Sequence, residues 1–574
     1  MDKKSGKKAV LHLTQQLPDN VQLTVSTGII SLAAALSAVG FLFLTNFIFS
    51  KTYLVFATRS KLYFVVASFL LISSTSLLVG YLLNVISPEA AGSGIPQLKS
   101  AYWKELGYIN WKNVLVKFFG GAISIGGGNS LGREGPSVYI GGGVASNLDG
   151  LMGKPRPKRQ GSAIVGAAAG LAAAFNTPIA AITFAIEEIL GDLNSRYLGR
   201  VVLGSVIGAF VVYAILGKQP AFELPSVDNV SWIHYLIVPL VALVASAAGV
   251  IFQTVALAWR GGLKKQKRIP RWLLPLFGGI ITWVLGISVF LGTGKIGVFG
   301  LGYQDLSNAL NNHLDWKIAG LLVVAKLLAT IAGYSFGGCG GIFAPSLFIG
   351  GLTGYFLGGL MSVWIPLTPA DHIVLAVVGM SACLGAIVQA PLTSILIAFE
   401  MTHQFSLVPG LLLGAIISQT LVRFVGNHNF YDALLVQDGH ELHKIKPPQD
   451  LKGWQNLPLS AVANPTPVFI EDLSINTMQQ QVEKFPYAFF PVIENGILTG
   501  IVSRQDLIDS IKSGNRPILK KAVVCTPEET IHDASQKFID HSVSLVMVGD
   551  PVSGKVTGLL TLHDLIRAQV SVYS

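Results

Sequence analysis

Three segments bracketed by glycine and proline lie in apolar surroundings and could bind an anion through the backbone. They are Gly92-Ser93-Gly94-Ile95-Pro96, Gly132-Arg133-Glu134-Gly135-Pro136 and Gly340-Gly341-Ile342-Phe343-Ala344-Pro345. Each places proline where a first helical turn would lie, since its missing N–H costs nothing there. Glycine lets the backbone approach a ligand closely, and the free N–H groups of a helix start attract anions. We expect three helix starts to converge on an anion site.

Carboxylates stand in the same apolar stretches, at Glu134 and at the adjacent pair Glu187 and Glu188. Acids in such surroundings are costly and usually functional. A protonated Glu134 would be neutral and could leave an anion path, whereas the ionised form would compete with the anion for the same N–H groups. For Glu188 the alternative is a helix-end carboxylate that faces water.

The elements that must position these residues are apolar runs of uneven length. Several are too short to cross a hydrocarbon core of ~30 Å, and others are too long for one straight helix. Broken helices are tolerated in lipid only where protein buries them or a cavity adjoins them. This pattern favours a transporter or a channel over a simple anchor. The runs lie near 25–49, 63–87, 114–125, 160–190, 198–217, 233–259, 272–291, 318–333, 341–364, 372–400 and 407–426.

Composition supports a membrane protein with a soluble tail. Of the 574 residues, 51% are hydrophobic and 13% are charged, about half the charged share of soluble domains. This excludes a soluble enzyme, a disordered chain and a fibrous protein. Residues 1–437 carry 16 acids and 29 bases, a net charge of +13, while the last 137 residues carry 15 acids and 12 bases, a net charge of −3.

Short basic clusters indicate how the chain is oriented. They lie at Lys3–Lys8, Lys154–Arg159 and Arg260–Arg271, and each flanks an apolar run. The excess of lysine and arginine on cytoplasmic loops places all three in the cytoplasm. The clusters lack interleaved aromatic residues, so we expect no nucleic-acid partner. The three cysteines are too few and too scattered for a disulfide framework or a metal site.

Residues 166–188 recur as residues 379–401, with a constant offset of 213. Duplicated halves are a recurring plan of transporters, with the substrate site at the repeat interface. Glu187 has a partner in Glu400 and is expected to be structural, whereas Glu188 aligns with Met401. The matched identities include Gly166/Gly379, Leu171/Leu384, Pro178/Pro391, Ile182/Ile395, Ala185/Ala398 and Glu187/Glu400.

A second repeat lies in the tail, where residues 500–508 recur as residues 558–566. Each copy has a β-rich run followed by Ser/Thr-x-x-Asp, at Ser503 to Asp506 and at Thr561 to Asp564. Serine or threonine at such a place is a natural helix N-cap. The paired copies predict a tandem α/β module.

Taken in order, GSGIP, GREGP and GGIFAP resemble the anion-binding segments of the CLC chloride channels and chloride/proton exchangers. The segment from Tyr431 to Leu435 resembles the fourth element of that family, and the tail resembles a tandem CBS-domain pair. The resemblance implies a polytopic α-helical membrane protein with an inverted internal repeat and broken helices. A C-terminal α/β tandem CBS domain would follow.

The resemblance also assigns residues to roles. The chloride-binding positions that it implies are Ser93, Gly94, Ile95, Ile342, Phe343 and Tyr431. Glu134 matches the external gating glutamate, and Glu188 matches the internal glutamate through which exchangers pass protons. Ser503, Asp506, Thr561 and Asp564 match positions that CBS pairs often use for an adenine nucleotide, although not all members bind one.

The implied function is chloride/proton antiport by a homodimer in a lipid bilayer, with chloride as transported ligand, no required cofactor, no metal and no enzymatic activity. The alternative is a passive, voltage- or pH-gated chloride channel on the same scaffold. A carboxylate at Glu188 favours the exchanger, because channels commonly lack one there.

The expected domains follow these boundaries. A cytoplasmic segment spans 1–24, and a transport domain spans 25–437 with repeats of roughly 25–217 and 233–426. A linker at 438–455 leads to CBS domains at 456–513 and 514–574. The GREGP form resembles bacterial members, so we expect a bacterial inner (cell) membrane with both termini in the cytoplasm.

Overall fold

The computed structural model describes residues 18–191, 197–217, 221–222, 224–225, 227, 232, 234–426, 429–440, 457–551 and 553–565. The expected N-terminal segment 1–24 and linker 438–455 lie largely outside these residues. The chain divides into two compact units, Met1–Lys446 and Pro447–Ser574, and each has a hydrophobic core of its own.

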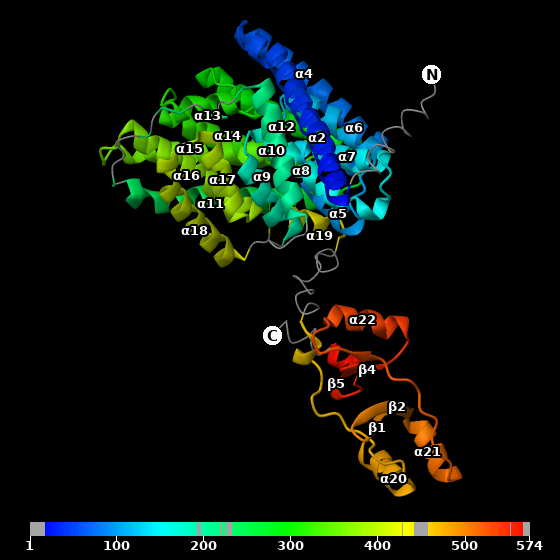
Figure 1. Ribbon diagram of the computed structural model, residues 1–574. Helices are drawn as coiled ribbons and strands as arrows, with labels where there is room; N and C mark the ends of the chain where they lie inside the picture. Colours follow the sequence, from blue (N-terminus) through cyan, green and yellow to red (C-terminus); the bar gives the residue numbers. More distant parts are fainter. Residues whose placement is uncertain are drawn as a thin grey trace. The chain divides into compact units, whose positions relative to one another are not determined.

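The first unit is helical throughout its described part (Figure 1). Nine helical segments among the described residues are long and apolar enough to cross a membrane. The helices of its first half are α2 (Asp19–Phe49), α3 (Val55–Ala57), α4 (Lys61–Tyr81), α5 (Ile95–Lys104), α6 (Trp111–Gly126), α7 (Glu134–Leu151), α8 (Gln160–Phe175), α9 (Pro178–Phe184) and α10 (Leu198–Ile215).

The second half repeats this order of long and short helices. Its helices are α11 (His234–Lys265), α12 (Leu274–Thr293), α13 (Tyr303–Leu310), α14 (Trp316–Ser335), α15 (Phe343–Met361), α16 (Pro369–Val388), α17 (Pro391–Thr402) and α18 (Val408–Val425), and α19 (Phe430–Gln437) follows them.

The duplication read from the sequence is visible at the residue level. The helices α8 and α16 both end in a left-handed residue, Asn176 at φ 60° and Gln389 at φ 56°. These positions are 213 apart, and each is followed two residues later by a proline that opens the next helix. The two halves therefore share the same break between consecutive helices.

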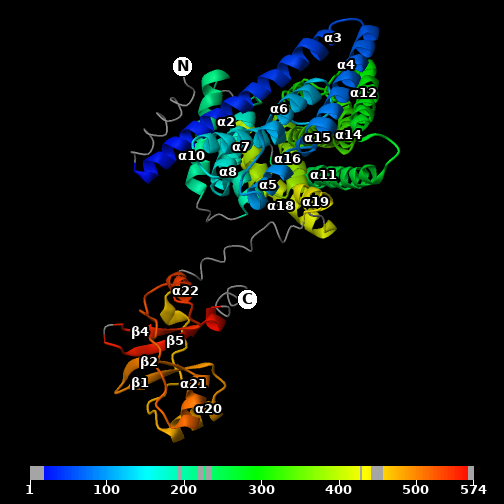
Figure 2. The ribbon, with the colours of Figure 1, turned by 90° about the vertical axis from the view of Figure 1, so that its right-hand side faces the viewer.

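Small residues bring the helices of each half close together. Gly141 of α7 faces Gly166 of α8, and a Cβ at either position would lie 2.3 Å from a backbone oxygen of the other helix. The pair Gly350 of α15 and Gly379 of α16 makes the same approach at 2.2 Å. The long helix α2 packs across α7, α8 and α10 (Figure 2). Such close contacts are typical of helix packing in lipid.

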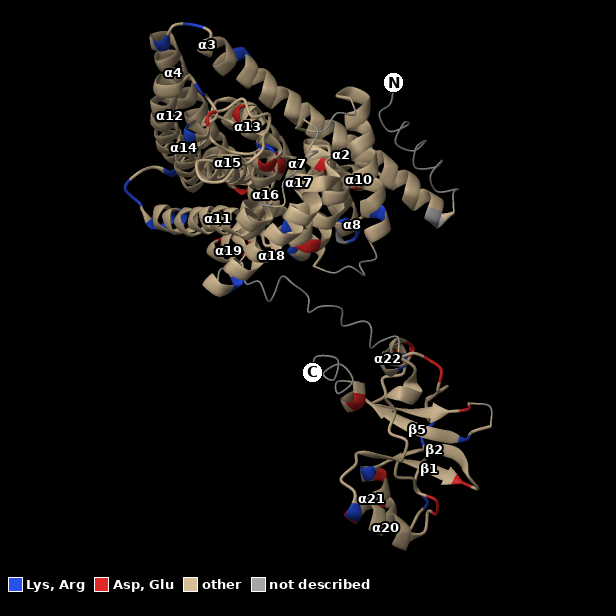
Figure 3. Cartoon of the chain, turned by 90° about the vertical axis from the view of Figure 1, so that its left-hand side faces the viewer, with Lys and Arg blue, Asp and Glu red and all other residues tan. Residues whose placement is uncertain are grey.

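Charged side chains are sparse in this unit and gather mainly toward helix ends and loops (Figure 3). The exceptions are fully buried ions on the helices, among them Lys99, Lys117, Glu134, Glu188 and Lys326.

The second unit is a mixed α/β module. Its first copy contains α20 (Ile475–Lys484), β1 (Phe489–Glu494), β2 (Ile497–Ser503) and α21 (Arg504–Ser513). Its second copy contains β3 (Val524–Cys525), α22 (Ile531–Asp540), β4 (Leu545–Gly549) and β5 (Val556–Thr561). Both pairs, β1–β2 and β4–β5, are antiparallel and carry one register shift each. The predicted tandem α/β repeat is thus present.

Candidate functional site

The three glycine-rich segments meet at their backbones. Gly132 and Gly341 exchange two hydrogen bonds, with N–H to O=C distances of 2.7 and 2.6 Å. The N–H of Gly340 also donates to the carbonyl of Gly92 at 3.3 Å. The starts of α5, α7 and α15 are therefore held together, as the spacing of glycine and proline predicted.

Two glycines make this approach sterically feasible. Gly94 is the N-cap residue of α5 at φ 98°, a conformation that side chains with a Cβ rarely adopt. Gly135 lies against Ser93, because a Cβ there would stand 2.3 Å from the Ser93 hydroxyl oxygen. The serine can reach the start of α7 only because Gly135 has no side chain.

The hydroxyl groups of Ser93 and Tyr431 are fully buried and lie close to one another, and neither makes a well-formed hydrogen bond with a described residue. Buried polar groups are normally paired, so these two orphaned hydroxyls fit the binding of a transported anion. The Tyr431 ring lies 6.3 Å from that of Phe343, centroid to centroid. The structure thus brings Tyr431 from α19 to the start of α15.

Glu134 opens α7 and is completely buried. One carboxylate oxygen accepts a hydrogen bond from the N–H of Ala344 at 3.3 Å, and the other accepts one from the Tyr303 hydroxyl at 2.9 Å. The guanidinium of Arg133 lies over the Tyr303 ring at 5.5 Å. The carboxylate therefore occupies one backbone donor at the start of α15.

Glu187 and Glu400 have a shared structural role. The carboxylate of Glu187 accepts the N–H groups of Leu392 and Thr393 at the start of α17, at 3.1 and 2.8 Å. The carboxylate of Glu400 accepts the N–H groups of Ile179 and Ala180 at the start of α9, at 3.0 and 2.7 Å. Each half thus places a carboxylate at the start of a helix of the other half. The helix dipole favours a negative group at that position.

Glu188 belongs to a π-helical turn, Ala185–Leu190, and is buried. Its carboxylate accepts from the Lys99 ammonium at 2.8 Å and from the Asn429 amide at 2.6 Å. Lys99 also contacts Asp432 at 2.5 Å. The alternative of a helix-end carboxylate that faces water is therefore wrong.

Two buried lysines at equivalent places hold the loops that precede the short helices. Lys117 of α6 donates to the carbonyls of Ala91 and Gly92, at 3.3 and 2.8 Å. Lys326 of α14, 209 residues later, donates to three carbonyls of the loop before α13, at 2.6 to 3.3 Å. The first loop carries Ser93, so Lys117 helps to position the candidate chloride ligands.

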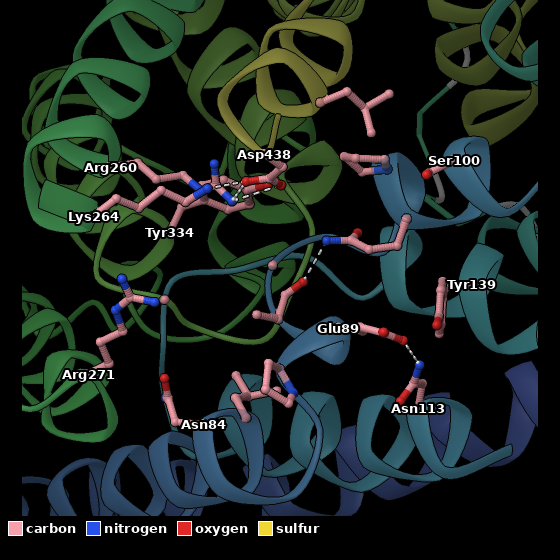
Figure 4. Close-up of a pocket in the computed structure, with 18 of the residues that line it drawn as sticks. Asn84, Glu89, Ser100, Asn113, Tyr139, Arg260, Lys264, Arg271, Tyr334 and Asp438 are labelled. Carbon is pink, nitrogen blue, oxygen red and sulfur yellow. Dashed lines mark hydrogen bonds and ion pairs between the residues drawn. The ribbon is translucent and has the colours of Figure 1, made fainter. Parts of the chain in front are cut away.

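A cavity of about 600 Å³ lies beside the anion-site backbone (Figure 4). Gly92 and Tyr334 line it, and so do the basic residues Arg260, Lys264 and Arg271. Arg260 and Lys264 both contact Asp438. Three acids, Glu89, Glu105 and Asp438, line the same cavity, which reaches the loop that carries Ser93.

The four candidate nucleotide residues form helix caps in the second unit. The Ser503 hydroxyl donates to Asp506 at 2.5 Å and accepts the N–H of Asp506 at 3.1 Å. The Thr561 hydroxyl donates to Asp564 at 2.6 Å and accepts the N–H of Asp564 at 3.3 Å. Both pairs therefore act as N-caps, and their use by a nucleotide stays a prediction.

Sequence reasoning did not find several residues that contact the candidate site. These are Lys99, Lys117, Tyr303, Tyr334, Asn429 and Asp432. Buried lysines in apolar runs were an available signal, since such ions are costly and usually functional. No pattern in the sequence indicates the pairing of Tyr303 with Glu134.

Comparison with known proteins gives consistent similarities. Residues 75–423 match the family described as voltage gated chloride channel, and residues 518–571 match the CBS domain. The chain is 32% identical over 375 residues to "H(+)/Cl(-) exchange transporter ClcA" of Vibrio campbellii, an alignment that spans 64% of this chain and 78% of that protein. It is 31% identical over 374 residues to the protein of the same name from Cronobacter sakazakii, across 64% of this chain and 79% of that one.

Solved structures show the same fold. A slow cyanobacterial Cl−/H+ antiporter aligns with a TM-score of 0.64 at 24% identity, over 72% of this chain and 97% of its own. A eukaryotic CLC transporter aligns with a TM-score of 0.60 at 21% identity, over 97% of this chain and 98% of its own.

Proposed function

The chain belongs to the family of voltage gated chloride channels and carries a C-terminal CBS domain, and on this premise we propose that it exchanges chloride for protons across a membrane. Members of this family are transporters, not enzymes. The relatives named as H+/Cl− exchange transporters support the exchange of the two ions rather than passive chloride flow.

The observation that carries the proposal is the position of the Glu134 carboxylate. It accepts the N–H of Ala344 at the start of α15, whose Phe343 ring lies near that of Tyr431. An ionised Glu134 and a chloride ion bound by the N–H groups of Ile342 and Phe343 would therefore compete for the same helix start, whereas a protonated Glu134 would accept hydrogen bonds there more weakly. Movement of one proton onto this residue is thereby tied to movement of an anion.

Glu188 provides the second proton position. It is buried, and its contacts are ionic and hydrogen-bonding. Tyr431 has both Glu134 and Glu188 as electrostatic neighbours, which supports a chloride site that responds to both acids. Ser93 and Tyr431 hold the chloride by their hydroxyl groups, and Ile95, Ile342 and Phe343 face it with the N–H groups of two helix starts. The predicted role of the Gly94 N–H is not available in this state, because it donates to the Gln97 side chain at 3.1 Å.

Purified protein in liposomes tests the exchange. The liposomes contain high chloride, the outside contains little, and valinomycin with equal potassium on both sides holds the voltage at zero. Chloride efflux is expected to drive proton uptake with no proton gradient imposed. Chloride efflux without any proton uptake would overturn the proposal and establish a passive channel.

Two substitutions locate the proton path. Both Glu134→Gln and Glu188→Gln are expected to abolish proton uptake while chloride continues to move, because the amide cannot accept the proton. Glu528→Gln, an exposed acid of the second unit, is the control and should leave both fluxes unchanged. Normal proton uptake in Glu188→Gln would remove that residue from the path.

The tail is assigned a regulatory role with an adenine nucleotide as its ligand. The support is the matched pair of Ser/Thr-x-x-Asp sites in two copies that pack together, since the N–H of Leu498 donates to Gly554 at 3.0 Å. Titration of full-length protein with ATP or AMP measures binding directly. Absence of binding at millimolar nucleotide would exclude the ligand, and binding without a change in flux would exclude the regulation.

The assembly is a homodimer in a bacterial inner membrane, with an anion path in each subunit and both termini in the cytoplasm. The clusters Lys154–Arg159 and Arg260–Arg271, which flank apolar helices, support this orientation. Labelling of single cysteines placed in these two loops of intact cells tests it. Labelling from outside would reverse the orientation, and a monomeric mass in detergent and lipid would overturn the dimer.

A further inference from the structure

A buried cluster of three ions links the inner acid to the helices of the chloride site. The Lys99 ammonium lies 2.8 Å from Glu188 Oε1 and 2.5 Å from Asp432 Oδ1. The three side chains are only 2%, 2% and 11% exposed, respectively. One cation is thus shared by two carboxylates in a setting of low dielectric constant.

Each member of the cluster comes from a different part of the fold. Lys99 is on α5, whose start carries Ser93 and Gly94. Asp432 is on α19, directly after Tyr431. The cluster therefore connects Glu188 to the two helices that bring the unpaired Ser93 and Tyr431 hydroxyls to the anion site.

Asn429 strengthens the connection to α19. Its amide nitrogen donates to Glu188 Oε2 at 2.6 Å, while its side-chain oxygen caps α19 by accepting the N–H groups of Tyr431 and Asp432 at 2.8 and 3.4 Å. The residue that fixes the start of α19 is thus the same one that contacts the inner acid. A change at Glu188 acts on the backbone of Tyr431 through a single side chain.

The charge of the cluster depends on one proton. With all three groups ionised its net charge is −1, and with Glu188 protonated it is zero. The titratable and charged groups that face Glu188 are Lys99 from α5 and Asp432 from α19, with Tyr431 as a further neighbour. Glu187 faces the start of α17. Protonation of Glu188 leaves the ammonium to Asp432 alone.

We propose that Lys99 is a positioning residue that couples the proton on Glu188 to the chloride site, by shifting between Glu188 and Asp432 as that proton comes and goes. This inference rests on the proposed exchange of chloride for protons. In the ionised state Lys99 and Asn429 hold α5 and α19 to Glu188. In the protonated state these contacts with Glu188 weaken, and α5 and α19 can move the Ser93 and Tyr431 hydroxyls relative to the anion.

Two substitutions that remove charges of opposite sign test the role of the shared cation. In Lys99→Met the two carboxylates lose the cation that they share, so they retain a proton more firmly, and the pH of half-maximal proton uptake should rise by about one unit. In Asp432→Asn the ammonium belongs to Glu188 alone, and the same pH should fall. The double variant Lys99→Met/Asp432→Asn removes one charge of each sign and should return the profile toward that of the wild type.

Matched controls separate this effect from a loss of folding. Lys104→Met removes an exposed lysine from the same helix and should leave the pH profile unchanged. Lys99→Arg keeps the charge and should shift the profile less than Lys99→Met. If Lys99→Met does not fold, the lower pH of half-maximal proton uptake expected in Asp432→Asn still tests the proposal, and an unchanged pH in that variant would contradict it.

The outcomes distinguish the inference from the function on which it rests. A wild-type protein that takes up no protons contradicts the proposed exchange itself. A wild-type protein that exchanges normally, with profiles unmoved in Lys99→Met and Asp432→Asn, overturns only the coupling role of Lys99. Chloride affinity is measured by calorimetry in Glu134→Gln, which removes the competing carboxylate, at a pH above and below the midpoint. It should differ severalfold there and lose this pH dependence when Lys99→Met is added.

Discussion

In the first half of the membrane unit α7 begins at Glu134, whereas the equivalent helix of the second half, α15, begins at Phe343. The repeat places Met401 where the first half has Glu188. Both acids of the proposed proton path are thus found in one half only. Phe343 instead packs against the aromatic ring of Tyr431.

Other buried or half-buried ions occur in both halves with similar contacts. Glu187 and Glu400 each accept two N–H groups at the start of a helix in the opposite half. Lys117 and Lys326 each donate to carbonyls of the loop before a short helix. The comparison teaches that these duplicated ions hold the backbone, while Glu134 and Glu188, which occur once, lie on the proposed ion path.

The largest effect is expected at the duplicated lysines. Lys326→Met leaves three buried carbonyls unpaired, each costing about 1–3 kcal/mol, so stability should fall by about 3 kcal/mol or more. Lys117→Met should cost less, because the carbonyls of Ala91 and Gly92 each keep a second donor, the Gln97 amide and the Gly340 N–H. Thermal unfolding of the purified variants in detergent measures both, and a stable Lys326→Met protein would contradict a scaffold role for the duplicated ions.

The next largest loss of stability is expected at the duplicated acids. Glu187→Gln and Glu400→Gln each replace a carboxylate that accepts two backbone hydrogen bonds, and hydrogen bonds to charged groups contribute about 1.5–3 kcal/mol. We expect similar destabilisation of the two variants, with chloride and proton fluxes per folded molecule unchanged. Loss of proton coupling in Glu187→Gln alone would break the symmetry on which the comparison depends.

Tyr303 offers a smaller and more specific test. Its hydroxyl donates to ionised Glu134 at 2.9 Å, so Tyr303→Phe should make that acid easier to protonate. The pH dependence of chloride flux should move up by about one unit, equivalent to about 1.4 kcal/mol. Tyr355→Phe, which removes a buried hydrogen bond to Leu314, is the control. An equal shift in the control would assign the effect to general destabilisation.

The sequence predicted the features that depend on short spacings. Gly-x-Gly-x-Pro and its relatives predict helix starts, because Gly94 must adopt a positive φ and proline fits a first turn. The offset of 213 predicts the paired breaks at Asn176 and Gln389. The resemblance to a known family added Ser93 and Tyr431, whose meeting is not implied by any local spacing.

The features that escaped prediction depend on distant partners or on burial within protein. Lys99 contacts acids that lie 89 and 333 residues away along the chain, so its role cannot be read from its neighbours. The helix α7 was not expected as an apolar run, because protein rather than lipid surrounds it. It can therefore carry Asn147 and Asp149 in buried positions. The enclosed helices α15 and α16 were found as apolar runs, so the polar residues of α7, rather than its burial alone, kept it from being recognised.

The second unit extends the comparison between copies and carries the smallest expected effect. Its second copy has an ion pair between Glu529 and Lys537, with Nζ and Oε2 2.7 Å apart. Partial burial acts to raise the pKa of Glu529, but hydrogen bonds from Lys537 and Thr526 outweigh burial and hold this pKa below its ordinary value.

Stability from this pair is present above the ordinary glutamate pKa and is lost as the pH falls through the lowered pKa of the folded state. Because both side chains are partly exposed, Glu529→Gln should weaken the second copy by less than about 1 kcal/mol at pH 7, and the difference from wild type should disappear in acid. Amide hydrogen exchange of the full-length protein measures this in α22, with α20 of the first copy as internal reference. Equal loss of protection in both helices would show that the two copies unfold as one cooperative unit, so that even a contact confined to one copy stabilises the pair.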